Sequence, residues 1–131
     1  MKKNKKIIIF ALIVSMFFGT FSSALAYSKS YTFNIRHSVT GSADYSLGAK
    51  STSTKAKGQT YTPSEKVSSD KSSFTVFIRK GLKSYSVGPI TANNKNATKS
   101  FGKVKKGSYS VNVNKYSSTG DRIKGSGTIN Q

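Results

Sequence analysis

Apolar and polar side chains alternate along most of the chain after residue 27, and this period of two is typical of β-strands that bury one face. No stretch in this region repeats apolar residues at helical spacing over a dozen positions. The clearest strand is SSFTVFIRKGL, with Phe74, Val76 and Ile78 on one face and Gly81 at its end. Because Phe77 lies on the opposite face, we expect this strand to be covered on both sides or to lie at the rim of a second sheet.

Two further segments predict a hairpin near the start of this region. SYTFNIRHSV places Tyr31, Phe33, Ile35 and His37 on one face, and ADYSLGAK continues the alternation after a short turn. The turn sequence VTGSA contains Gly41, which can adopt a positive φ. We therefore expect these two segments to pair with each other.

A second hairpin is predicted for residues 105–129, KKGSYSVNVNKYSSTGDRIKGSGTI, with SSTGD as its loop. This register places Val113 opposite Gly125 and Val111 opposite Gly127. Inward glycines beside large side chains indicate close backbone approach or aromatic rings lying over them. The segment is similar to the last hairpin of bacterial exported β-sandwich domains, a resemblance that implies a fold and no activity. The predicted inner face comprises Tyr109, Val111, Val113, Ile123 and Ile129.

The remaining segments complete an all-β chain. KSYSVGPI predicts a strand in which Pro89 marks a strand end or a sheet edge. Residues 50–64 contain one large apolar side chain, Tyr61, so they form either an edge strand protected by lysines or a loop, and we favour the edge strand. SEKVSSDKS, TANNKNATKS and KVKKGS carry loop signals. About six to eight short strands predict a small antiparallel β-sandwich, with a small β-barrel as the alternative.

The first 26 residues have the three parts of a secretory signal peptide. MKKNKK is basic, residues 7–21 are apolar, and SSALA supplies small residues for cleavage after Ala26. A membrane anchor is the alternative, although the apolar run is shorter than the ~20 residues that span a bilayer. Cleavage would leave residues 27–131 as a single all-β domain without a transmembrane segment. The absence of cysteine suits a bacterial secreted protein better than a small disulfide-stabilised scaffold.

The inventory of titratable side chains argues against catalysis. The chain has one histidine and four acidic residues, whereas hydrolysis needs a tuned acid or base beside a nucleophile, or a metal. We interpret His37 as a residue at the sheet rim, and a hydrolase that combines it with Asp44 and a serine is the weaker alternative. The acids are too scattered to predict a zinc or calcium site. KGSGT at residues 124–128 lies in a predicted strand rather than before a helix, so we expect no phosphate loop and no cofactor.

Positive charge is the most informative feature of the composition. The formal charge is +18, and removal of the four lysines in the signal peptide leaves +14. A merely soluble surface mixes both signs, so this excess favours a polyanionic partner. Of the 18 basic residues after residue 26, 15 are lysines, which favours diffuse attraction over the bidentate recognition that arginine provides.

These features predict a secreted, strongly cationic, non-enzymatic protein that associates with polyanions at the cell surface or in the extracellular matrix. The accessible partners are wall polymers such as teichoic acids, anionic lipid, extracellular DNA and acidic polysaccharide, without sequence-specific reading of nucleic acid. We expect a secreted, extracellular protein, for which positive charge is the one means of retention at the cell wall. A bacteriocin-like or membrane-active antagonist is the alternative, which the lack of an amphipathic helical pattern disfavours. The candidate polyanion-binding residues are Arg79, Lys80, Lys83, Lys103, Lys105, Lys106, Lys115, Arg122 and Lys124.

Overall fold

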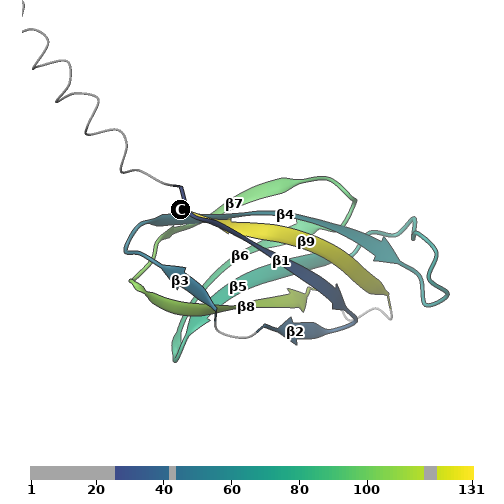
Figure 1. The fold of residues 1–131 in the computed structure, drawn as a ribbon. Coiled ribbons are helices and arrows are strands. Elements are labelled where there is room, and N and C mark those ends of the chain that lie inside the picture. Colours follow the sequence, from purple (N-terminus) through teal and green to yellow (C-terminus); the bar gives the residue numbers. More distant parts are fainter. Residues whose placement is uncertain (1–25, 42–43, 117–120) are drawn as a thin grey trace, which may run out of the picture.

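Two antiparallel β-sheets pack face to face as a β-sandwich, which confirms the predicted fold over the barrel alternative (Figure 1). The computed structural model describes residues 26–41, 44–116 and 121–131, and these ranges contain no helix. Residues 1–25 lie outside the described part, so the signal peptide stays a prediction. The strands in the described ranges are β1 (Ser28–Ile35), β2 (Ser38–Thr40), β3 (Tyr45–Leu47), β4 (Ser51–Tyr61), β5 (Ser73–Lys80), β6 (Lys83–Thr91), β7 (Ala97–Lys103), β8 (Gly107–Lys115) and β9 (Arg122–Asn130).

The two sheets differ in their strand order. One sheet has the order β1-β9-β4-β7, and the other has the order β2-β8-β5-β6, with β3 also paired to β8. The short strands β2 and β3 pair with successive parts of the same edge of β8: β2 pairs with residues 112–114 and β3 pairs with residues 107–109. Pro89 lies in β6, which is an edge strand, as its missing N–H predicts.

The predicted hairpin of residues 105–129 is wrong in its pairing. β8 pairs with β2, β3 and β5, whereas β9 pairs with β1 and β4 in the opposite sheet (Figure 1). Strands that face each other across a core show the same alternation as strands that pair edge to edge, so the pattern could not distinguish the two arrangements. Most of the predicted loop, residues 117–120, lies outside the described residues. The predicted inner face is confirmed, since these residues are all buried: Tyr109, Val111, Val113, Ile123 and Ile129.

The predicted pairing of the first two segments is also wrong. β1 pairs with β9, and the chain then bends at Arg36 and His37 and enters the other sheet as β2. β3 follows in the same sheet and contacts β1 through side chains, since the Tyr45 hydroxyl donates a hydrogen bond to the Ser30 carbonyl at 3.0 Å and Lys29 Nζ lies 5.3 Å from the Tyr45 ring centroid. The segments are therefore opposite each other in the sandwich rather than neighbours in a sheet.

Residues 50–64 contain a strand rather than only a loop, as we predicted. The predicted edge position is wrong, because this strand is in the middle of its sheet. β4 lies between β9 and β7. The loop predicted for TANNKNATKS is wrong in part, because β7 begins at Ala97 and pairs with β4 as the edge of the sheet. Each strand has only one large apolar residue, Tyr61 in β4 and Phe101 in β7, so the period-two signal of both strands is weak. The inward positions of β4 carry the small residues Thr52, Thr54, Ala56, Gly58 and Thr60, all of which are buried.

Large aromatic rings fill the space that small inward residues leave. A Cβ on Gly125 would come within 2.5 Å of the Phe33 ring, and one on Gly127 within 2.5 Å of the Tyr31 ring. The Phe33 ring in turn packs against Phe74 across the core, with ring centroids 5.0 Å apart. These contacts confirm that the two glycines are packing residues beneath aromatic rings.

The predicted strand SSFTVFIRKGL corresponds to β5, and its buried face is confirmed. Phe74, Val76 and Ile78 are fully buried, and Gly81 follows the strand with a φ of +56°. Phe77 is half-buried on the outer face, where the Arg79 guanidinium lies 5.5 Å from the ring centroid. In the described ranges, no helix has the length and apolar character to cross a membrane.

Candidate functional site

The cationic residues predicted to bind polyanions lie at opposite ends of the sandwich. Six of them surround the β7–β8 loop, at the left of Figure 1 near the marked C-terminus, and the β5–β6 turn, at the lower left. Three lie at the other end, near the β8–β9 connection. We call the first group, joined by Lys50, the basic end: Lys50, Arg79, Lys80, Lys83, Lys103, Lys105 and Lys106. The mixed end carries both signs of charge: Glu65, Asp70, Lys115, Asp121, Arg122 and Lys124.

A two-residue turn at the basic end joins β5 to β6. Lys80 and Lys83 are the last paired residues of the two strands, and Gly81 between them takes the positive φ that favours glycine. Glycine at the first central position is characteristic of tight hairpin turns. Leu82 occupies the second position and is fully exposed. The sequence RKGLK thus places two lysines and a leucine at the tip of the turn.

The β7–β8 loop is fixed beside this turn by hydrogen bonds and burial. Val104 is buried and its N–H donates to the Lys50 carbonyl at 3.1 Å. The Lys105 N–H donates to the Tyr85 hydroxyl at 3.1 Å, and the Tyr109 hydroxyl donates to the Lys105 carbonyl at 2.5 Å. These contacts fix the backbone of the loop against the sandwich, and the exposed side chains of Lys105 and Lys106 extend into solvent.

The turn and the loop are joined directly. Lys80 Nζ donates a hydrogen bond to the Lys106 carbonyl at 2.9 Å. Lys103 pairs with Ser51 at the start of β4, which brings Lys50 to the same end. Cations from three parts of the sequence therefore meet on one surface.

The seven cations of the basic end are exposed and make no ion pair in the described part of the chain. Two of them lie near aromatic rings instead. Arg79 is over Phe77, and Lys83 Nζ lies 5.5 Å from the centroid of Tyr85. An aromatic face stabilises a cation without neutralising it, so the charge of these groups stays available to a partner.

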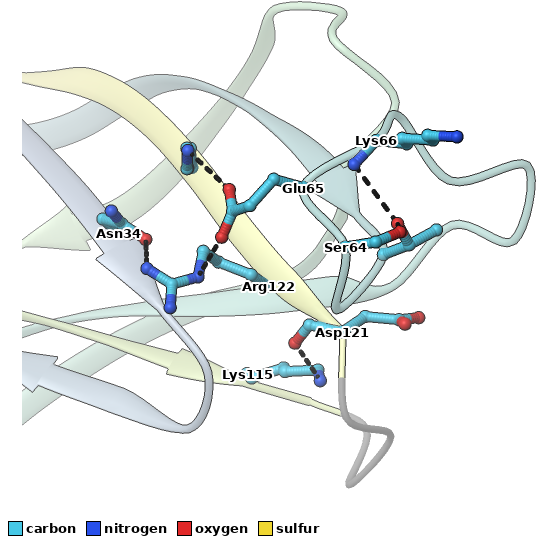
Figure 2. Close-up of polar contacts among 9 residues, drawn as sticks. Asn34, Ser64, Glu65, Lys66, Lys115, Asp121 and Arg122 are labelled. Carbon is cyan, nitrogen blue, oxygen red and sulfur yellow. Dashed lines mark hydrogen bonds and ion pairs between the residues drawn. The ribbon is translucent and has the colours of Figure 1, made fainter.

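Part of the charge at the mixed end is compensated, as Figure 2 shows for Glu65. Glu65 accepts from Lys124 Nζ at 2.9 Å and contacts Arg122 Nε at 3.4 Å. Its hydrogen bond with Lys124 holds the pKa of the Glu65 carboxyl below its ordinary value. Arg122 Nη1 also donates to Asn34 Oδ1 at 3.1 Å. Two of the nine predicted residues are thus engaged with a carboxylate.

Lys115 differs from the basic-end lysines in its surroundings. It is half-buried, and its Nζ donates to the Asp121 backbone carbonyl at 2.6 Å (Figure 2). Burial lowers the pKa of its ammonium group. Lys115 pairs with Phe74 at the start of β5, and Arg79 lies five residues further on, so about 17 Å of strand separates it from the basic end.

The structure thus brings together six of the nine predicted residues and places three elsewhere. The sequence could not show this division, because it depends on which strand ends share one end of the sandwich. Lys50 was missed because its position beside Lys103 requires the pairing of β4 with β7. The local signal for the tip is RKGLK, in which glycine between basic residues indicates a turn.

His37 lies in the bend between β1 and β2 and is exposed. Its backbone carbonyl accepts a hydrogen bond from the Lys115 N–H at 2.7 Å. Asp44 forms an ion pair with Lys29, and the hairpin expected to bring Asp44 toward His37 does not form. No group of three or more potential metal ligands occurs among the described residues. KGSGT lies within β9, as predicted.

Comparison of the chain with protein-family models and with curated proteins gave no match. The function is therefore inferred from the chain's own residues and geometry.

Proposed function

We propose that this is a secreted, non-enzymatic protein that binds anionic polymers or surfaces through its basic end. The observation that carries the proposal is the segregation of charge. Seven exposed cations without an ion pair gather at one end, whereas three of the four acidic residues lie at the other. The fourth acid, Asp44, is paired with Lys29. Like charges in one place repel each other, and an anionic partner relieves that repulsion.

The strength of single contacts indicates the kind of partner. An exposed ion pair contributes less than about 1 kcal/mol, because water screens it and both side chains lose freedom. Useful affinity therefore needs several contacts at once, which a polymer or surface with closely spaced charges provides and a small anion does not. Such binding releases counterions and weakens steeply as salt rises.

The chemistry of the basic end favours recognition of charge rather than of a particular sequence. Six of its seven cations are lysines, which act as compact point charges, whereas Arg79 is the one arginine among them. Wall polymers, anionic lipid, extracellular DNA and acidic polysaccharide are the partners that an exported protein meets. Contacts of this type to nucleic acid position a protein on the phosphates without reading bases.

Two variants of equal net charge test whether the basic end binds. Lys105→Gln with Lys106→Gln removes two charges from the basic end, and Lys66→Gln with Lys95→Gln removes two exposed charges elsewhere. The measurement is the salt concentration that elutes each protein from an anionic polymer column. The wild type should bind at about 50 mM salt and elute near about 0.5 M, where the screening length falls to a few ångströms.

We expect the Lys105/Lys106 variant to elute at clearly lower salt and the Lys66/Lys95 variant to elute close to the wild type. Equal shifts for both variants would show that net charge alone controls binding. A wild-type protein that flows through at low salt would overturn the proposed function.

A further inference from the structure

Leu82 is the most exposed large apolar side chain in the described ranges, with a relative exposure of 107%. It lies at the tip of the β5–β6 turn, between Lys80 and Lys83. Figure 1 shows this turn projecting beyond the neighbouring strands at the basic end. Single exposed apolar residues are common on proteins, but this one stands on a projecting tip within the basic end, where the seven cations make no ion pair among the described residues.

We infer that the partner of the basic end is an anionic membrane surface, into which Leu82 inserts while the surrounding cations contact the lipid headgroups. This inference rests on the proposed function and narrows its partner. A soluble polyanion offers negative charge but no apolar layer in which the leucine side chain could be buried. A lipid interface offers negative headgroups above an apolar layer, which is the complement of a leucine between two lysines at the basic end.

The local geometry supports insertion of the tip as a unit. The hydrogen bond from Lys80 Nζ to the Lys106 carbonyl fixes the turn against the β7–β8 loop. The backbone of Lys106 therefore lies within reach of the Lys80 side chain, and Lys80 and Lys83 are the lysines next to Leu82 in the turn. Lysine side chains can bury their methylene stems and keep their ammonium groups at headgroup level while a neighbouring leucine lies deeper.

The position of Leu82 predicts that the protein contacts the membrane with its basic end and with no other part of its surface. Of the other exposed large hydrophobic residues in the described chain, Val67 and Tyr116 lie toward the mixed end and Val39 lies in β2. A single leucine contributes too little apolar surface for deep insertion, so binding requires the charges and the leucine together.

The test uses vesicles of neutral lipid with about 30 mol% anionic phosphatidylglycerol, a composition at which basic residues are drawn to the surface. Leu82→Ser keeps every charge and removes the apolar group. Val67→Ser is the matched control, since Val67 is also exposed (59%) but lies away from the basic end. We expect Leu82→Ser to lower the vesicle partition constant by about tenfold, whereas Val67→Ser should leave it unchanged.

Binding of the same variants to a soluble polyanion, duplex DNA, separates the two proposals. Leu82→Ser should bind DNA like the wild type, because it keeps every charge. If the wild type binds vesicles and Leu82→Ser binds them equally well, the inference is overturned and the proposed function stands. If the wild type binds neither vesicles nor DNA, both fail.

A second variant reports insertion directly. The chain contains no tryptophan, so Leu82→Trp introduces a single fluorescent reporter at the tip. We expect a blue shift of its emission with anionic vesicles and no blue shift with DNA. An emission maximum that stays at the solvent-exposed wavelength on bound vesicles would contradict insertion.

Discussion

The Tyr31 hydroxyl is a polar group within the core. The side chain is buried, and its oxygen lies 2.7 Å from Thr54 Oγ1 on the neighbouring part of the sheet. Burial raises the pKa of Tyr31 to about 12, because the anionic phenolate would lose its hydration. The pair shows why β4 carries threonine rather than valine at this position, since the hydroxyl gives the buried tyrosine a partner.

We predict that stability falls at high pH partly through Tyr31. Its pKa is near 10 in the unfolded chain and about 12 in the folded protein, so the folded state holds the phenol proton more tightly. The resulting contribution to stability is complete below about pH 10 and is lost as pH rises through about 12. Burial also raises the pKa of Tyr45 and Tyr109, which act in the same direction. In urea unfolding, Tyr31→Phe should cost about 1 kcal/mol at pH 7 and lose stability less steeply than the wild type between about pH 10 and 12. Parallel pH profiles would contradict this assignment.

Among the strands, β4 shows how small inward residues weaken the prediction of a strand from its alternation of apolar and polar residues. Its inward face is made of threonine, alanine and glycine, so a search for large apolar residues identifies it only as a weak edge strand. The apolar volume that its sequence lacks comes from the rings of β1 and β5 that lie over its small residues and those of β9. The two strands that accommodate these rings, β4 and β9, were predicted as strands, whereas their partners and the central position of β4 were not.

Amide hydrogen exchange should show that β4 is a central strand. Residues 53–56 are paired with β7 on one side and with β9 on the other. In a central strand successive N–H groups donate to opposite neighbours, so all four amides should exchange slowly and at comparable protection. In the edge strand β6, alternate amides should exchange faster. An alternating fast and slow pattern in residues 53–56 would contradict the strand order.

For the molecule as a whole, the consequence of the fold is an uneven distribution of charge. All four acids lie outside the basic end, so its seven positive charges, half of the net +14 after residue 26, are not offset by an acid within it. Local repulsion of this kind opposes folding, and it can be reduced by salt or by a bound polyanion. Stability and binding are thereby linked through the same residues.

We predict that moderate salt stabilises this protein. Raising salt from about 10 to about 150 mM shortens the screening length from about 30 to about 8 Å, which should raise Tm by about 4 °C or more if repulsion costs about 1 kcal/mol. The Lys105→Gln/Lys106→Gln variant should show a smaller increase than Lys66→Gln/Lys95→Gln, as measured by calorimetry. A Tm that falls or stays constant over this range would contradict destabilising repulsion at the basic end.

The sequence by itself determined the class of the fold and the buried faces of its main strands, because alternation along a strand is a local property that follows from backbone geometry. It also determined the excess of positive charge and the end of the strand SSFTVFIRKGL at Gly81. The tertiary structure alone decided the partners of β1, β4, β8 and β9, since the same alternation serves strands that pair in one sheet and strands that face each other across the core. For the same reason it alone decided which cations meet. Lys50, Lys80 and Lys106 are far apart in sequence, and they share one end because sheet pairing and packing bring their strand ends together.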